Sequence, residues 1–174
     1  MKKEGLVGVV GRPSWDESFM FSAYWAATRA SCEYLKNGAV VVKDKRIRAS
    51  GYNGAPDPIE NCLQAGCRKN QAGVAFSDKG QSACIGAHAE TNAMDQLARD
   101  DTKGATLYTV FFPCTPCAKS IAAKGIREVV YSQMYEEPKS LTYKIFKKAK
   151  IKVRRLDMYP QRYFRMLKEI FEKK

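Results

Sequence analysis

The 174 residues predict an α/β fold, a three-layer α/β/α sandwich around a mixed five-stranded sheet. Short strand-like runs alternate with helical stretches, and this order favours parallel strands joined by helices in the second half of the chain. The length suits a single domain, residues 1–174, with one hydrophobic core. A composition of 45% hydrophobic and 28% charged residues excludes a disordered or low-complexity chain.

The first half is expected to hold one helix and a pair of strands. Ser14 and Glu17 have the spacing of a capping box, which predicts a helix that starts after Ser14 and runs to about residue 33. Residues 39–42 and 47–52 resemble two strands joined by a charged turn. Residues 53–87 hold three cysteines and few periodic apolar positions, so we expect a long irregular stretch that is functional or cross-linked.

The second half is expected to alternate helices with strands. We predict helices over residues 88–99, 115–124, 140–150 and 160–172, and strands over residues 105–112, 129–132 and 151–156. The last helix carries apolar residues spaced like the buried stripe of an amphipathic helix: Tyr163, Phe164, Met166, Leu167, Ile170 and Phe171.

Positive charge is concentrated at the C-terminal end. Residues 139–174 contain 13 Lys and Arg against three acidic residues, which accounts for +10 of the total net charge of +12. Such a segment is either a nucleic-acid arm or a solvated helix face whose lysine stems cover apolar surface. We expect the solvated face, because a basic tract alone identifies no ligand.

No membrane segment is expected. The longest run without a charged residue, 104–118, has 15 residues with two prolines, and a spanning helix needs about 17–25 apolar residues. Near the N-terminus the apolar run covers only residues 6–10, which is too short for a secretory signal. We therefore expect a cytoplasmic protein whose six cysteines are reduced thiols or metal ligands.

One histidine and two cysteines have the pattern of a catalytic metal site. His88, the only histidine, stands two residues before Glu90, and Pro113 precedes the pair Cys114 and Cys117. One imidazole and two thiolates give three ligands to zinc and leave a fourth position for water. Glu90 is placed to move protons to and from that water. The alternatives are a core histidine and a redox or structural CxxC pair, but the joint pattern favours catalytic zinc and is the signature of zinc nucleobase deaminases.

The sequence resembles the cytidine and deoxycytidylate deaminase family, and within it the dCMP deaminases, including the competence-operon type. The resemblance covers about residues 12–135 and rests on these segments: RPSWDE at 12–17, GAV at 38–40, GYNG at 51–54, HAE at 88–90, PCTPC at 113–117, and VVY at 129–131 followed by Tyr135. It implies a sandwich of the cytidine deaminase type and a single deaminase domain with a core at 12–135, an insert at 53–87 and a basic segment at 139–174.

The resemblance implies zinc-dependent hydrolysis of dCMP to dUMP, the precursor of thymidylate. His88, Cys114 and Cys117 would hold the zinc and Glu90 would carry protons. A homo-oligomer, dimer or hexamer, is implied as well, with dCTP and dTTP as effectors. Nucleic acid and membranes are not expected as partners.

The same resemblance assigns roles to further residues. Asn53, Ala89 and Tyr135 would contact the substrate, although an Asn-Gly pair such as residues 53–54 is also typical of a plain turn. Arg99 would respond to effectors, or it satisfies carbonyls at a helix end. In addition, Asn37 stands where related sequences usually have valine.

Four cysteines remain outside the catalytic pattern: Cys32, Cys62, Cys67 and Cys84. Four thiols suit a second, structural zinc that would attach the irregular stretch to the first helix, as in some dCMP deaminases. The alternative is four inert thiols.

Two other functions stay open. A deaminase of bases in nucleic acid, such as a tRNA adenosine deaminase, shares the histidine and cysteine motifs. A non-catalytic, zinc-stabilised nucleic-acid-binding competence protein would have no use for Glu90.

Overall fold

The computed structural model describes residues 12–75, 83–134 and 140–172. The elements in chain order are α1 (Trp15–Ala27), β1 (Gly38–Lys43), β2 (Arg46–Tyr52), α2 (Cys62–Ala65), α3 (Arg68–Gln71), α4 (Ala89–Asp95), α5 (Arg99–Thr102), β3 (Thr106–Phe111), α6 (Thr115–Ala123), β4 (Glu128–Gln133), α7 (Ser140–Lys148), β5 (Lys152–Arg155) and α8 (Pro160–Phe171).

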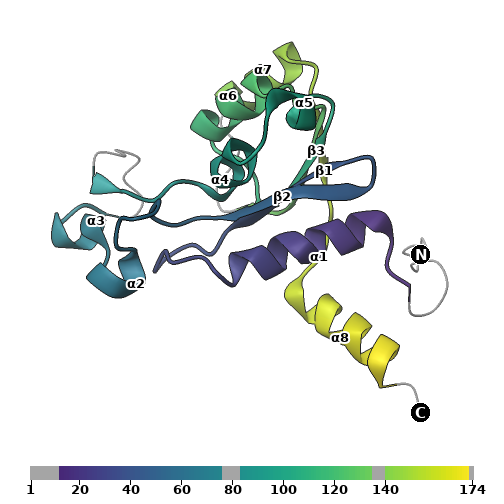
Figure 1. The fold of residues 1–174 in the computed structure, drawn as a ribbon, viewed down its shortest axis with the longest axis horizontal. Coiled ribbons are helices and arrows are strands. Elements are labelled where there is room, and N and C mark those ends of the chain that lie inside the picture. The colour runs from purple at the N-terminus through teal and green to yellow at the C-terminus, as the bar shows by residue number, and fades with distance from the viewer. Residues whose placement is uncertain (1–11, 76–82, 135–139, 173–174) are drawn as a thin grey trace.

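The five strands form one mixed sheet in the order β2-β1-β3-β4-β5. Strand β1 pairs antiparallel with β2 and β3, whereas β3, β4 and β5 run parallel. Helices α1 and α8 lie on one side of the sheet and α4, α6 and α7 on the other (Figure 1). The three-layer architecture and the parallel second half are therefore confirmed.

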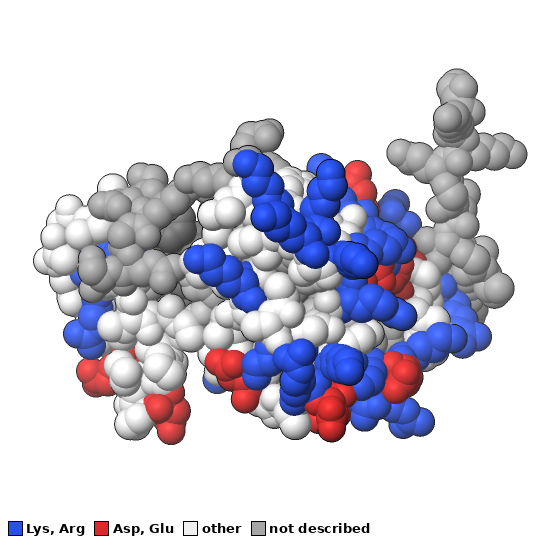
Figure 2. All heavy atoms as spheres, turned by 90° about the horizontal axis from the view of Figure 1, so that it is seen from above, with Lys and Arg blue, Asp and Glu red and all other residues white. Residues whose placement is uncertain are grey.

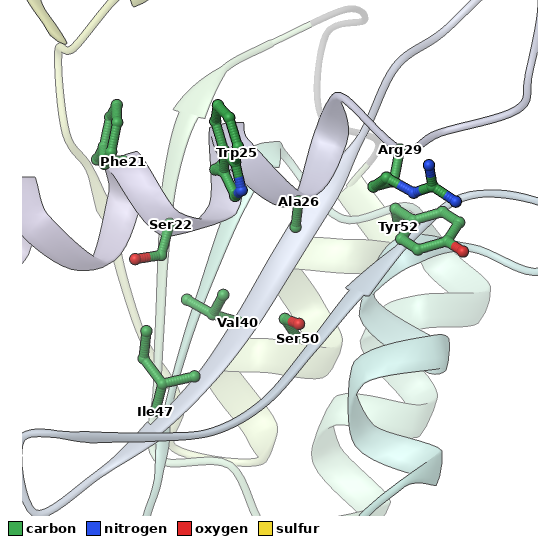
Figure 3. Close-up of a pocket in the computed structure, with 9 residues that line it drawn as sticks. All are labelled: Phe21, Ser22, Trp25, Ala26, Arg29, Val40, Ile47, Ser50 and Tyr52. Atoms are coloured by element: carbon green, nitrogen blue, oxygen red, sulfur yellow. The ribbon is translucent and has the colours of Figure 1, made fainter.

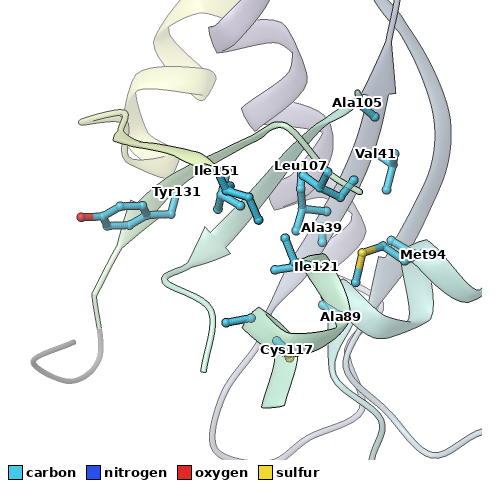
Figure 4. Packing of buried hydrophobic residues seen from close by; sticks show 14 of the residues in the cluster. Ala39, Val41, Ala89, Met94, Ala105, Leu107, Cys117, Ile121, Tyr131 and Ile151 are labelled. Atoms are coloured by element: carbon cyan, nitrogen blue, oxygen red, sulfur yellow. The ribbon is translucent and has the colours of Figure 1, made fainter. Parts of the chain in front are cut away.

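Successive residues of β1 are buried against opposite helical layers, because side chains alternate across a strand. Val40 packs with Met20 of α1, and Val41 packs in a second cluster with Met94 and Ile121 (Figure 4). Both faces of the sheet are thus covered by helices at β1.

Two glycines let helices approach the β1–β2 hairpin at backbone distance. A Cβ on Gly38 would lie 2.1 Å from the carbonyl oxygen of Ala23 in α1, and a Cβ on Gly51 would lie 2.5 Å from that of Ala89 in α4. Only glycine leaves room for such contacts. The start of α4 is therefore fixed against β2, and this start carries Glu90.

Three predictions about elements need correction. The first helix begins with the expected Ser14–Glu17 capping box but ends at Ala27 rather than near residue 33, and Ser31 instead donates its N–H to the carbonyl of Asn53 at 3.2 Å. The helix predicted over 88–99 is divided into α4 and α5. The stretch 53–87 contains the short helices α2 and α3.

The predicted buried stripe of the last helix is narrower than expected. Tyr163 is buried and Met166 packs beside it, but Phe164 and Phe171 are 72% and 79% exposed. Helix α8 contacts α1 through one side only, where Tyr163 packs edge-on against Phe21 and Tyr24.

The face seen in Figure 2 shows Lys and Arg side chains outnumbering Asp and Glu. On α7, the side chains of Lys144, Lys147 and Lys148 are exposed, as expected of a solvated helix face. In the described part of the chain, every helix is too short or too polar to traverse a bilayer.

Candidate metal centre

Two helix starts bring the predicted metal ligands together. His88 is the N-cap of α4, and Cys114 is the N-cap of α6, with Cys117 in the first turn of that helix. Cys114 follows strand β3, as the sequence predicts. His88 follows a single β-bridge, in which Ala87 pairs with Gly54, rather than a strand.

The three side chains have the geometry of a zinc site. Nδ1 of His88 lies 3.3 Å from Sγ of Cys114 and 3.2 Å from Sγ of Cys117, and all three ligand atoms lie within 4.8 Å of one another. Ligand bonds of about 2.0–2.3 Å in a tetrahedron place neighbouring ligand atoms about 3.5 Å apart. The residues therefore fit a zinc ion. No other three His, Cys, Asp or Glu side chains gather this closely among the described residues.

Glu90 lies next to the three ligands without being one of them. Its side chain is buried, and Oε2 accepts a 3.7 Å hydrogen bond from the Cys117 thiol. Burial raises the pKa of the Glu90 carboxyl, although the charge of His88 opposes this effect. A carboxyl with a raised pKa is suited to take up and release a proton near neutral pH.

The cluster has polarised protons before any cation binds. Interaction with Cys117 lowers the pKa of Cys114, and interaction with Cys114, together with burial, raises the pKa of Cys117. The hydrogen bond to Cys114 in turn raises the pKa of His88. A divalent cation bound here displaces these protons, so its affinity depends on pH.

Helix α7 supports the cysteine segment through a residue that the sequence did not single out. The buried Thr142 hydroxyl lies 2.9 Å from that of Thr115, between the two cysteines. No sequence motif marks Thr142, because its role depends on how α7 packs against α6. Cys117 itself belongs to the buried cluster together with Ala89 and Ile121 (Figure 4).

The three residues predicted to contact the substrate lie in different surroundings. Asn53 follows β2, where its Oδ1 accepts from the Asn37 N–H and its Nδ2 donates to the Leu35 carbonyl, both at 2.7 Å. Its amide therefore anchors a turn, and each end keeps capacity for one more hydrogen bond. Ala89 is fully buried at the start of α4. Tyr135 lies outside the described residues.

Arg99 is not on the helix that follows His88, as the sequence suggested, but begins α5. Its guanidinium donates to the carbonyl of Ala123, the last residue of α6. Of the two interpretations of Arg99, effector response or a cation that hydrogen-bonds the carbonyls at a helix end, this contact fits the second.

The other four cysteines lie on loops and short helices. Cys62 begins α2 and Cys67 is the N-cap of α3, whereas Cys84 is exposed in a loop and Cys32 follows α1. Burial raises the pKa of Cys62, and the other three cysteines add to this effect, so each of them lies within electrostatic reach of Cys62. They do not form a group as close as the ligands around His88.

A groove on the opposite side of the sheet contains none of the predicted site residues. It lies between α1 and the hairpin, as Figure 3 shows, and is lined by these nine residues: Phe21, Ser22, Trp25, Ala26, Arg29, Val40, Ile47, Ser50 and Tyr52. No carboxylate, thiol or imidazole lines it. The reactive groups are thus separate from this groove.

Comparisons with known proteins agree with this site. A family model for the cytidine and deoxycytidylate deaminase zinc-binding region matches residues 13–133. The deoxycytidylate deaminase of Mycobacterium phage D29 is 47% identical over 124 residues, which cover 70% of this chain and 97% of the phage protein. That of Saccharomyces cerevisiae is 39% identical over 153 residues, which cover 87% of this chain and 48% of the yeast protein.

A solved structure shares the fold as well. The dCMP deaminase of cyanophage S-TIM5, in complex with dCMP and dUMP, superposes with a TM-score of 0.66 at 26% identity, covering 83% of this chain and 98% of that protein. This chain thus spans nearly all of the two phage proteins and about half of the yeast protein. With more than two thirds of its length matched by the family model, the chain belongs to the cytidine and deoxycytidylate deaminase family.

Proposed function

We propose that the protein hydrolyses dCMP to dUMP and ammonia and so supplies dUMP for thymidylate synthesis. The observation that supports this most strongly is the group of His88, Cys114 and Cys117 with the buried Glu90 beside it. The relatives named deoxycytidylate deaminase, and the related structure with dCMP and dUMP, favour this nucleotide over others.

The chemistry divides between the metal and the chain. A zinc ion held by His88, Cys114 and Cys117 supplies a Lewis acid that lowers the pKa of water to about 7. Glu90 accepts a proton from the attacking water and returns one to the amino group that leaves from C4 of cytosine. Because Glu90 is 3% exposed, its carboxyl is largely shielded from bulk water.

Asn53, Ala89 and Tyr135 are proposed to hold the nucleotide. The Asn53 turn is bridged to the residue before His88, since Gly54 and Ala87 exchange N–H···O bonds of 3.2 and 2.9 Å. A nucleotide contacted by Asn53 is thereby placed at a fixed distance from the metal ligands. Ala89 lies at the start of α4, between His88 and Glu90.

The direct test is a substrate panel. Purified protein is incubated with dCMP, deoxycytidine and a tRNA anticodon stem, and dUMP, deoxyuridine, inosine and ammonia are measured. We expect rapid release of ammonia from dCMP and slow release from the nucleoside. Release from the RNA alone would overturn the proposal in favour of a tRNA deaminase.

We further propose a homo-oligomer that dCTP activates and dTTP inhibits, with a second zinc on Cys32, Cys62, Cys67 and Cys84. The proximity of the other three cysteines to Cys62, which raises the pKa of that thiol, supports the second zinc. An effector role for Arg99 predicts that Arg99→Met changes the response to dCTP. An unchanged response would leave Arg99 with its bond to Ala123 alone.

A further inference from the structure

Asn37 is a buried amide at the junction of three chain segments. It precedes β1, and its side chain is buried. Its backbone pairs with Asn53: the Asn37 N–H donates to Asn53 Oδ1 at 2.7 Å, and the Asn53 N–H donates to the Asn37 carbonyl at 3.2 Å. Its side chain points the other way, toward β3.

The Asn37 side chain continues the ladder between β1 and β3. In that ladder Ala39 faces Thr109, so the antiparallel register, continued by two residues, places Asn37 opposite Phe111. The Phe111 N–H donates to Asn37 Oδ1 at 3.2 Å, and the Thr109 hydroxyl approaches the same oxygen at 3.4 Å. A side-chain oxygen thus serves as the acceptor that a strand backbone would supply.

These bonds connect the two segments that carry the metal ligands. Phe111 lies three residues before Cys114. On the other side, Asn53 is followed by Gly54, which pairs with Ala87, the neighbour of His88. One path from the cysteine segment to the histidine segment therefore runs through Asn37 and the Asn53 turn, beside the direct packing of α4 on α6.

We propose that Asn37 is a positioning residue that sets the Asn53 turn relative to the strand leading to Cys114, and thereby sets the nucleotide against the reacting centre. The inference rests on the proposed function, and in particular on the contact between Asn53 and the nucleotide. Asn37 itself touches no reacting atom in this account; it acts through Asn53.

The substitution Asn37→Val separates the two halves of this junction. Valine keeps the backbone pair with Asn53 but removes the side-chain acceptor of the Phe111 N–H. The Asn53 turn then stays attached to β1, but it loses the connection to β3 that the Asn37 side chain provides. Small displacements of a positioning group weaken binding or turnover severalfold or more.

The experiment is a double-mutant cycle with dCMP as substrate. N37V, N53A and the double variant are compared with wild type for KM, kcat, zinc content and melting temperature. Val130→Ala is the matched control, because Val130 is fully buried on the α1 side of the sheet, away from this path. If N37V is recovered only as aggregate, N37S takes its place in the cycle.

We expect N37V to keep its zinc, to raise KM for dCMP about tenfold and to change kcat less. Adding N37V to N53A should raise KM little further, since residues that act through one another are not additive. A KM equal to that of V130A at similar loss of stability, or additive effects in the double variant, would overturn the inference. If the wild-type protein is inactive on dCMP, the proposed function is refuted instead. If N53A has a normal KM, the role of Asn53 is refuted.

Discussion

The residues proposed to bind the catalytic zinc, the first set, and the four cysteines proposed to bind a second zinc, the second set, are placed in different ways. His88, Cys114 and Cys117 lie on the first turns of α4 and α6, with their ligand atoms within 4.8 Å. The four cysteines at 32, 62, 67 and 84 lie on loops and helices of four residues, and none of them is fully buried. Helices packed on a sheet place side chains without help from a metal, whereas loops depend on the metal to bring their ligands together.

The largest expected effect is at the first set. We expect His88→Ala to lose its zinc and to slow dUMP formation at least about 1,000-fold, because the ion and its Lewis acidity are lost together. Cys84→Ser, an exposed cysteine of the second set, should keep most of the activity. For each variant, the zinc content and the initial rate on dCMP are measured. An H88A variant that retains zinc and turnover would remove the distinction between the two sets.

The next effect tests how rigidly the first set is supported. A Cβ at Gly51 would lie 2.5 Å from the Ala89 carbonyl, so Gly51→Val should lower the free energy of unfolding by about 1–3 kcal/mol and displace Glu90. A Cβ at Gly86, beside Cys84, meets only atoms 3.7 Å away or farther. Gly86→Ala is therefore the control, and it should change the free energy by less. Urea unfolding measures the free energy of unfolding of both variants. Equal losses of free energy would mean that the two regions are packed equally closely.

A smaller effect is expected at the second set. We expect wild type to contain about two zinc ions per chain and Cys62→Ser about one, with a melting temperature lower by about 5 °C and kcat on dCMP little changed. Metal analysis of both proteins decides the matter. About one zinc in wild type would refute the second site.

The smallest effect concerns an ion-pair network far from both sets. Arg154 contacts Asp16 and Glu128 at 2.9 Å each. Burial raises the pKa of each carboxyl, but the hydrogen bonds and positive charges around it, with Arg154 as the main partner, together outweigh burial, so both pKa values are lowered overall. Carboxyls with lowered pKa values stabilise the fold above their unfolded values of about 4 and lose that contribution as the pH falls further.

Arg154→Met should therefore be less stable than wild type at pH 6, by up to about 1 kcal/mol for such partly exposed pairs. The difference should shrink as the pH falls below about 4. Urea unfolding at pH 3, 4, 5 and 6 measures it. A difference that grows toward low pH would contradict the sign of these pKa shifts.

The sequence predicted the fold and the first site because both depend on local patterns. Alternating strands and helices specify the layers, and the CxxC spacing places Cys114 and Cys117 on one helix turn. The division of the helix after His88 was not predicted; at the end of α4 the Gln96 side chain donates to the carbonyl of Ser50 in β2, a contact that no local sequence pattern shows. The role of Asn37 was not predicted either, since it depends on a register between strands that are far apart in the chain.

The buried carboxylate of Glu90 is proposed to move protons at a zinc centre held by three other side chains. The most direct measurement takes Glu90→Gln and determines zinc content and dUMP formation on the same sample. We predict zinc equal to wild type and a rate on dCMP lower by at least about 1,000-fold. A zinc-loaded E90Q protein that forms dUMP at the wild-type rate would contradict the account.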